Sequence, residues 1–349
     1  MKVKQTKKIK IGNIYIGGDS KVTVQSMTTT DTRDVDATVY QILKLEKAGC
    51  EIIRCAVPDM AAADAIKDIV KRIHIPLVAD IHFDYRLALK SIENGISKLR
   101  INPGNIGSVD KIKLVAEAAK ESGIPIRIGV NSGSLEGDIL KKYGHVCAQA
   151  LVESALRHVE ILENLNFYDI VISIKSSDVL MMIESYKLIS DSVDYPLHLG
   201  VTEAGTTWRG TIKSSVGIGA LLASGIGDTI RVSLTGDVVD EVKVGIEILK
   251  SIGCRDSGIK FVSCPTCGRT QINLIKIANE VEERLEHCNK NIKVAIMGCV
   301  VNGPGEAREA DIGIAGGKGV GLIFKKGEII KTVNEEDLVE ELIREIDKL

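Results

Sequence analysis

Aromatic residues are scarce in this sequence, and long apolar runs are missing. Phe, Trp and Tyr make up 3% of its 349 residues, although apolar residues as a whole reach 44%. The core must therefore be built from Ile, Val, Leu and Ala, which favours buried parallel strands between helices over a β-sandwich. No apolar stretch approaches the roughly 18 residues that a membrane-spanning helix needs, so we expect no membrane partner.

An excess of either charge is missing too. The 45 Lys and Arg residues nearly balance the 47 Asp and Glu residues, for a formal net charge of −2. Without a basic block, nucleic acid is not expected as a partner. Residues 1–10 are rich in lysine but lack the apolar run of a secretory signal. We therefore expect a cytoplasmic protein, in which the eight cysteines do not form a disulfide framework.

Short runs of Val and Ile alternate with longer helical patterns along residues 1–255. The period predicts a (β/α)8 TIM barrel, preceded by a hairpin at 9–18 that closes its bottom. A doubly wound open sheet is the alternative. It usually has a glycine fingerprint after its first strand, where this sequence has Thr28-Thr29-Thr30-Asp31-Thr32. The eight strand candidates are 22–27, 51–57, 76–82, 98–102, 125–131, 169–175, 196–203 and 229–234.

The pattern changes after Arg255. Helices are predicted at 271–286 and from 335 to the end, so that residues 256–349 form a small α+β domain. Five short strand candidates accompany these helices, at 260–263, 293–297, 311–315, 321–324 and 328–331.

Three cysteines of this second domain follow predicted strands. Cys264 and Cys267 form a Cys-x-x-Cys pair, and Cys299 lies in a second loop rich in glycine. Spacing alone leaves three interpretations open. An iron–sulfur cluster with one further ligand would use all three thiols. A structural zinc site would lack its usual second pair, and a redox dithiol would leave Cys299 unused. The other five cysteines are interpreted as small apolar core residues.

Five predicted barrel strands each carry a cation toward the carboxyl end. In a TIM barrel these ends form the active site. Five cations around one opening repel each other unless an anion binds there, and a guanidinium matches phosphate oxygens. The alternative for each cation is a buried ion pair with a carboxylate such as Glu51, Asp80 or Glu203. The five cations are Arg54, Arg100, Arg127, Lys175 and Arg231.

Polar residues accompany these cations. Asn102, Asn131, Ser233 and His82 lie near strand ends, and His82 could equally have a structural role. Glu203 is the best acid–base candidate, because a carboxylate facing the cations can transfer a proton once substrate excludes water. The alternative for Glu203 is a surface or helix-capping position.

A cluster that carries electrons and an opening lined by cations together suggest a reductase of a phosphorylated small molecule. At this point the sequence resembles the 4-hydroxy-3-methylbut-2-enyl diphosphate synthase family in its short bacterial form. The most specific segments are Ser263-Cys264-Pro265-Thr266-Cys267-Gly268-Arg269 and the Gly298-Cys299 loop through Ala307. The resemblance covers essentially the whole chain, with further matching segments at 24–27, 53–58, 79–83, 99–105, 127–134 and 202–205.

The resemblance implies an oxidoreductase of the non-mevalonate isoprenoid (terpenoid) route. Such an enzyme opens 2-C-methyl-D-erythritol 2,4-cyclodiphosphate reductively, with loss of water, to (E)-4-hydroxy-3-methylbut-2-enyl diphosphate. It implies a 4Fe-4S cluster on Cys264, Cys267, Cys299 and Glu306 that receives electrons from ferredoxin or flavodoxin. It also implies a homodimer in which the barrel of one subunit faces the cluster domain of the other.

The resemblance further assigns roles to single residues. Glu203 becomes the proton donor. Glu306 is also catalytic as an exchangeable ligand, since a carboxylate binds iron less firmly than a thiolate does. The alternatives are a non-redox barrel transferase of the pterin-binding type with a structural zinc domain, and a zinc-stabilised interaction module. The substrate-binding set is Arg54, His82, Arg100, Asn102, Arg127, Asn131, Lys175, Arg231, Ser233 and Asn302.

Overall fold

The computed structural model describes residues 4–256, 258–286, 288–299 and 307–349. It divides the chain into two compact units, Met1–Arg255 and Asp256–Leu349. Each has its own apolar core, so the two are described separately. In the described part of the chain, no helix combines the length and apolar character needed to span a membrane.

The first unit contains eight parallel strands in the order β8-β7-β6-β5-β4-β3-β10-β9. A parallel bridge between Ile172 and Leu197 joins the two ends of this order, so the sheet closes into a barrel. The prediction of a TIM barrel is confirmed, and the open-sheet alternative is wrong. The strands are β3 (Thr23–Met27), β4 (Ile52–Ala56), β5 (Leu77–Asp80), β6 (Lys98–Ile101), β7 (Ile126–Asn131), β8 (Ile170–Lys175), β9 (His198–Leu199) and β10 (Thr229–Ile230).

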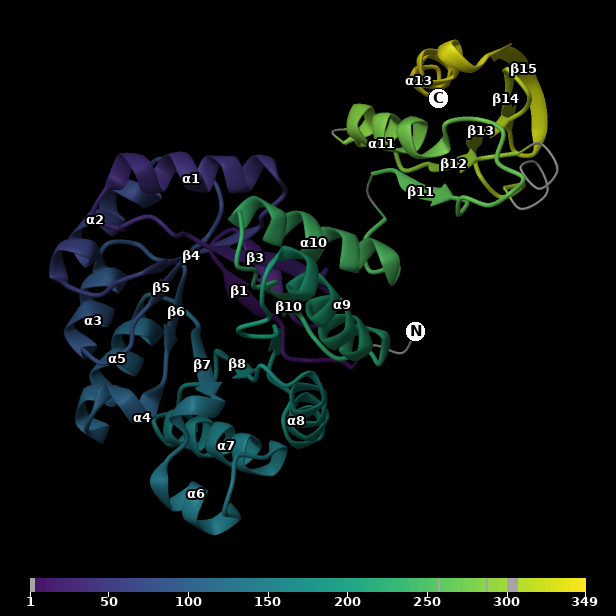
Figure 1. Cartoon of the computed structure of the whole chain (residues 1–349). Helices are drawn as coiled ribbons and strands as arrows, with labels where there is room; N and C mark the ends of the chain where they lie inside the picture. Colours follow the sequence, from purple (N-terminus) through teal and green to yellow (C-terminus); the bar gives the residue numbers. More distant parts are fainter. Residues whose placement is uncertain (1–3, 257, 287, 300–306) are drawn as a thin grey trace. The chain divides into compact units, whose positions relative to one another are not determined.

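Helices surround these strands (Figure 1). Five of them begin at an aspartate whose carboxylate accepts a backbone N–H of the first turn, which satisfies a donor that the helix leaves free. The helices are α1 (Val35–Lys47), α2 (Met60–Val70), α3 (Tyr85–Glu93), α4 (Pro103–Ile106), α5 (Val109–Glu121), α6 (Gly137–Tyr143), α7 (Ala148–Asn164), α8 (Val179–Ser192), α9 (Thr207–Ala223) and α10 (Val238–Ser251), with a short 3-10 turn at Ser132–Ser134.

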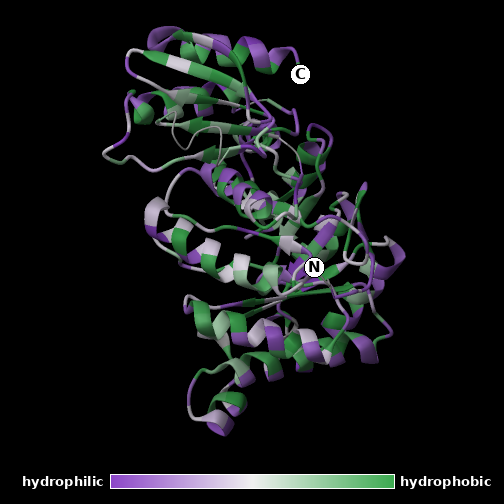
Figure 2. Cartoon of the chain, turned by 90° about the vertical axis from the view of Figure 1, so that its right-hand side faces the viewer, coloured by the Kyte–Doolittle hydropathy of each residue, from purple (hydrophilic) through white to green (hydrophobic). Residues whose placement is uncertain are grey.

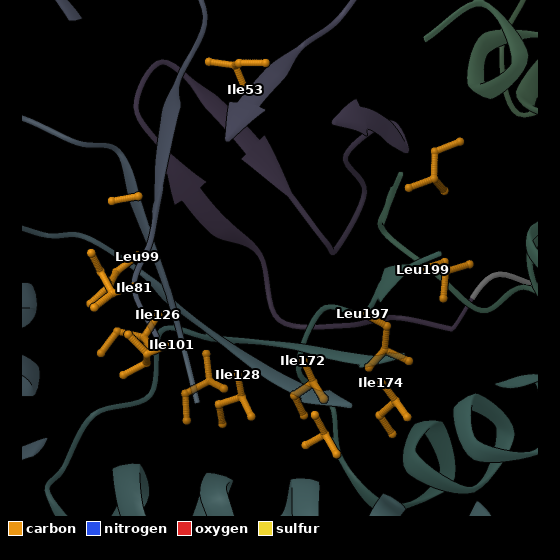
Figure 3. Close-up of a cluster of buried hydrophobic side chains, with 14 of the residues drawn as sticks. Ile53, Ile81, Leu99, Ile101, Ile126, Ile128, Ile172, Ile174, Leu197 and Leu199 are labelled. Atoms are coloured by element: carbon orange, nitrogen blue, oxygen red, sulfur yellow. The ribbon is translucent and has the colours of Figure 1, made fainter. Parts of the chain in front are cut away.

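The wall between strands and helices is aliphatic. Figure 3 shows Ile101, Ile128 and Ile172 with other Ile and Leu side chains on the barrel strands, and all of them are buried. Successive side chains of a strand point to opposite faces, so each residue between two of these points into the barrel. Apolar and polar residues also alternate along the helices (Figure 2), which is typical of helices that cover a core with one face.

The amino-terminal end of the barrel is closed by a hairpin. Strands β1 (Ile9–Ile11) and β2 (Ile14–Ile16) pair antiparallel. Their isoleucines share a small core with Ile52, Val78 and Val171, which lie at the first or second position of β4, β5 and β8. The bottom of the barrel is therefore filled with apolar side chains, and polar chemistry is confined to the other end.

The second unit is the predicted α+β domain. Its sheet runs β11-β12-β13-β14-β15, with the first three strands parallel and the last three antiparallel. Ile277 of α11 and Leu342 of α13 belong to a core with the isoleucines of β12 and β13. The strands are β11 (Lys260–Ser263), β12 (Lys293–Met297), β13 (Ile312–Gly316), β14 (Val320–Lys325) and β15 (Glu328–Asn334); the helices are α11 (Leu274–Leu285), α13 (Leu338–Asp347) and a 3-10 turn at Glu335–Asp337.

Candidate active site

Strand alternation directs the predicted cations into the barrel. On β6, Leu99 and Ile101 belong to the aliphatic wall, so Arg100 between them points inward. Arg54, the third of five residues of β4, and Arg127, the second of six residues of β7, alternate with apolar neighbours in the same way. The predicted position toward the carboxyl end of the strand is therefore wrong for Arg127. All three guanidinium groups are buried, and Arg127 has no exposed surface at all. The closed barrel thus brings residues from separate strands into one cationic interior.

Asp80, at the end of β5, pairs with two of these cations. Its Oδ1 accepts a hydrogen bond from Arg100 Nη1 at 3.0 Å, and its Oδ2 lies 3.6 Å from Arg54 Nε. Burial opposes ionisation of Asp80, but a hydrogen bond from His82 and the nearby arginines outweigh it, so the pKa of Asp80 lies far below its usual value. The ion-pair alternative therefore holds for Arg54 and Arg100.

Arg231, just after β10, pairs with a carboxylate that the sequence did not suggest. Its Nη2 lies 3.3 Å from Glu241 Oε2, and Glu241 Oε1 also accepts the backbone N–H of Leu234 at 2.9 Å. Burial raises the pKa of Glu241, and the charge of Arg231 opposes that rise. Glu51, which the sequence suggested as a partner for the cations, instead pairs with Arg255, whose Nη2 lies 2.6 Å from Glu51 Oε2. A carboxylate on a following helix gives no strand-end signal, which is why Glu241 was missed.

Arg127 and Lys175 differ from the three cations that pair with carboxylates. Within the part of the chain that the structure describes, Nε, Nη1 and Nη2 of Arg127 have no hydrogen-bond partner. Burial, with repulsion from Arg54 and other cations, lowers the pKa of both Arg127 and Lys175 far below the usual values. A buried guanidinium without a partner is costly. Its presence indicates a site shaped for an anion.

A pocket lies at the carboxyl ends of β8, β9 and β10. It brings together Lys175, Arg231 and Ser233 of the predicted set with Thr202 and His198, which the sequence analysis did not select. His198 Nδ1 lies 2.6 Å from Thr229 Oγ1. Burial and the surrounding cations lower the pKa of His198, which favours its neutral form. The signal available in the sequence was the position of His198 between Leu197 and Leu199, which are both buried.

Lys98 is a second residue that the sequence analysis missed. It is fully buried, and its Nζ donates to Gln25 Oε1 at 3.2 Å. Burial lowers its pKa far below the usual value, and repulsion from Arg127 adds to the effect. The alternation Lys98-Leu99-Arg100-Ile101 places Lys98 on the same face as Arg100, so the period of two would have revealed it.

The other predicted residues lie around these groups. His82 is half exposed, with Nε2 3.4 Å from Arg100 Nη1. Asn102 is buried and caps α4 through Gly104 N, while Asn131 pairs in register with Lys175. Glu203 is exposed in the loop after β9, at a φ of +51°. Thr206 is the N-cap of α9, so the capping alternative for Glu203 is wrong, whereas its exposed side chain agrees with the surface alternative.

The three predicted thiols lie in the second unit after β11 and β12. These strands are parallel neighbours with Ser263 opposite Ile296, so Cys264 and Cys299 follow at the same edge of the sheet. Cys264 Sγ accepts the backbone N–H of Gly298 at 3.1 Å. Hydrogen bonds from the backbone and side chain of Arg269 lower the pKa of the exposed Cys267 thiol. All three are free cysteines.

The donor chemistry suits an iron–sulfur cluster, although the ligand set is incomplete in the described residues. Among those residues no group of three His, Cys, Asp or Glu side chains is arranged around one metal position. Glu306 and Asn302 lie outside the described residues. A thiol with a lowered pKa and another that accepts an amide N–H are the features that Cys ligands of clusters show.

The closed barrel, with the buried Arg127 that has no hydrogen-bond partner among the described residues, is typical of a barrel enzyme that acts on an anionic small molecule. The comparisons with known families identify it further. Residues 6–246 match the model of the GcpE TIM-barrel domain, and residues 260–348 match that of the GcpE protein C-terminal domain. The chain belongs to the GcpE family.

Curated relatives match over the full length. A protein of Clostridium acetobutylicum is 73% identical over 345 residues, which cover 99% of each chain. Proteins of Clostridium perfringens and Caldanaerobacter subterraneus are 71% and 66% identical, with coverage of at least 98% of each chain. All three are named 4-hydroxy-3-methylbut-2-en-1-yl diphosphate synthase (flavodoxin).

Solved structures show similarity in the fold alone. The 7,8-dihydropteroate synthase of Vibrio fischeri superposes with a TM-score of 0.50 at 12% identity and covers 71% of this chain and 98% of its own. An N-acetylneuraminic acid synthetase of Leptospira borgpetersenii reaches the same TM-score at 14% identity, covering 81% of this chain and 98% of its own. With far more similar relatives over both units, the pterin-type transferase alternative is not favoured.

Proposed function

We propose that the protein opens 2-C-methyl-D-erythritol 2,4-cyclodiphosphate reductively and dehydrates it to (E)-4-hydroxy-3-methylbut-2-enyl diphosphate, in the non-mevalonate isoprenoid route. A relative that carries the name of this synthase is 73% identical across 99% of the chain. The geometric support is the fully buried Arg127, whose guanidinium nitrogens have no partner among the described residues. A diphosphate would supply the missing acceptors.

The reaction consumes electrons and releases water. The bond between the tertiary carbon and its ring oxygen breaks, and that oxygen stays on the diphosphate. The neighbouring carbon loses its hydroxyl group as water, and a double bond forms between the two carbons. Counted on protonated phosphates, two electrons and two protons convert one substrate molecule into one product and one water. The enzyme must therefore hold a diphosphate, receive two electrons and deliver protons.

The barrel residues bind and orient the diphosphate. Arg127 offers buried positive charge without a partner in the described residues, and the partly buried Lys175 lines the pocket, so a phosphoryl oxygen gains most there. Arg231 and Ser233 line the same pocket as Lys175. As the ring opens, negative charge grows on the departing phosphate oxygen, and fixed cations stabilise that change without reorganising.

Glu203 is the proposed proton donor. It lies in the loop after β9, three residues beyond Gly200 at the pocket wall. Its exposure in the structure allows it to exchange protons with solvent before substrate covers it. Asn102, Asn131 and His82 complete the proposed substrate contacts from neighbouring strand ends, and Asn302 contributes one from the second unit.

The second unit is proposed to hold a 4Fe-4S cluster on Cys264, Cys267, Cys299 and Glu306. Such a cluster, when bound, supplies electrons one at a time and a Lewis-acidic iron. The residues prepare for it in two ways. Arg269 favours the thiolate of Cys267, and the N–H of Gly298 compensates charge on the Cys264 sulfur.

Three further assignments belong to this proposal. Reduced flavodoxin, which the names of the relatives specify, or ferredoxin donates the electrons. The protein acts in the cytoplasm as a homodimer, in which the barrel of one copy works with the cluster domain of the other.

Anaerobic turnover of the cyclic diphosphate with a strong reductant tests the proposal. Anaerobically purified protein should contain about four iron and four sulfide per chain, and mass spectrometry should detect the open-chain diphosphate. One equivalent of zinc, no sulfide and no product would overturn it and favour a zinc-stabilised barrel protein instead.

A further inference from the structure

The barrel strands contain one acidic residue among many cations. Strands β3–β10 carry five Lys or Arg residues and a single carboxylate, Asp80. In a site that must attract a diphosphate, a buried negative charge works against substrate binding. Attraction of the diphosphate therefore gives no reason for Asp80, and its contacts with the arginines have to supply one.

Asp80 lies between the two arginines that it contacts. Strand β5 is hydrogen-bonded to β4 on one side and to β6 on the other, with Asp80 directly opposite Arg100. One carboxylate oxygen lies 3.0 Å from Arg100 Nη1 and the other 3.6 Å from Arg54 Nε. The side chains of all three residues are at most 5% exposed, so water does not compete strongly for these contacts.

Each arginine is also held from its other side. Arg54 Nη2 lies 2.8 Å from the sulfur of Met27 on β3. Arg100 packs against Gly129 on β7, where a Cβ atom would come within 2.7 Å of Arg100 Nε. The absence of a side chain at Gly129 thus leaves room for the guanidinium. The two arginines are confined by neighbours and linked through one carboxylate, while Arg54 Nη1 stays without a partner among the described residues.

We propose that Asp80 is a positioning residue, which holds Arg54 and Arg100 in the orientation that receives the diphosphate. The inference rests on the proposed function, since it assumes that the anion bound here is a diphosphate. The negative charge of Asp80 weakens the electrostatic attraction of the diphosphate, but its contacts keep two long, flexible arginine side chains in one conformation before substrate arrives.

The variant Asp80→Asn separates orientation from charge because the two effects have opposite signs. Loss of a negative charge alone would tighten the binding of any anion. Loss of orientation should weaken the binding of inorganic pyrophosphate to the full-length protein about tenfold, measured by titration calorimetry. With the cyclic diphosphate, KM should rise by a similar factor while kcat changes less than about threefold.

Asp80→Glu and Asp64→Asn complete the experiment. Asp80→Glu keeps the charge and displaces the carboxylate by one methylene, so it should also weaken pyrophosphate binding. Asp64 lies exposed on α2 and pairs with Lys90 of α3. The control variant Asp64→Asn should therefore bind pyrophosphate as the wild type does. Unchanged or tighter binding in Asp80→Asn, or wild-type binding in Asp80→Glu, would overturn the positioning role.

The readouts keep this inference distinct from the proposed function. If Asp80→Asn does not fold by circular dichroism, Asp80→Glu decides the question alone. A role in stability only would lower kcat through loss of active protein and leave KM and the pyrophosphate affinity unchanged. Absence of turnover in the wild type would refute the proposed reaction, whereas pyrophosphate titration would still measure what Asp80 does.

Discussion

The two units of this protein place their functional residues in the same way but prepare them differently. Both put them on parallel strands or directly after them. In the barrel, Arg54 and Arg100 are buried and already held by Asp80. In the second unit, Cys267 is exposed and no group of three ligands converges among the described residues. The barrel site is therefore organised by protein contacts, whereas the described thiols are not arranged around one metal position.

Removal of a thiol should give the largest effect, because the proposed cluster loses one of its ligands. Cys264→Ser is expected to lose its cluster, with activity reduced by well over about 100-fold. Iron and sulfide analysis with the visible absorbance spectrum measures the cluster directly. Cys147→Ser is the control, since Cys147 precedes α7 in the barrel unit and should leave both iron content and activity intact. Full iron content in Cys264→Ser would remove Cys264 from the ligand set.

Glu203→Gln should spare binding and stop chemistry. The amide keeps the size of the side chain but cannot donate the proton, so kcat should fall by about 100- to 10,000-fold with the cluster spectrum unchanged. Steady-state kinetics and pyrophosphate affinity distinguish the two effects. The exposed Glu247→Gln on α10 is the matched control. Wild-type turnover in Glu203→Gln would exclude the proton role.

A mixture of Glu203→Gln and Cys264→Ser tests whether the two units cooperate across a homodimer. Random exchange of subunits would create one intact site in each mixed dimer, so about a quarter of wild-type activity should return. Neither variant should show this activity when it is assayed alone. Sedimentation analysis of the mixture gives the oligomeric state independently. Activity that stays at the level of the single variants would favour a site built within one chain.

Arg127→Met should weaken pyrophosphate binding without lowering the free energy of unfolding. Pyrophosphate affinity should fall at least about tenfold, which corresponds to 1.4 kcal/mol. The free energy of unfolding should stay the same or rise by about 1 kcal/mol, because an unpaired buried guanidinium is replaced by an apolar chain of similar length. Calorimetry and urea unfolding provide the two values. Arg157→Met on the surface of α7 serves as control, and loss of stability without loss of affinity would assign Arg127 a structural role.

Mild acid should give the smallest effect, and it should be confined to the barrel unit. Burial lowers the pKa of both His158 and His198, so the unfolded chain takes up protons first as the pH falls. Stability should therefore decrease below about pH 6.5, by up to about 1.4 kcal/mol per pH unit and histidine, until the folded-state pKa is reached. The second unit has no histidine among its described residues. Urea unfolding from pH 7 to 5 should show a smaller slope in His198→Gln.

Most of the barrel could be predicted because short runs of Val and Ile alternate regularly with helical patterns along the chain. Runs of Val and Ile located all eight strands, yet β9 is only His198–Leu199 and β10 only Thr229–Ile230, where longer runs were expected. Beyond these residues the chain leaves the ladder to form the pocket with Gly200, Val201 and Ser233. Local hydrophobicity cannot distinguish a strand from a pocket wall that continues in the same direction.

The sequence by itself determined the closed barrel, the presence of the cations on separate barrel strands and the three thiols after two strands. These features depend on local periodicity and on residue type, which are written along the chain. Only the tertiary structure decided which cations have partners. It paired Arg54 and Arg100 with Asp80, paired Arg231 with Glu241, and left Arg127 with none in the described residues. Pairing depends on which side chains the closed sheet brings within a few ångströms, and that proximity joins residues far apart in sequence.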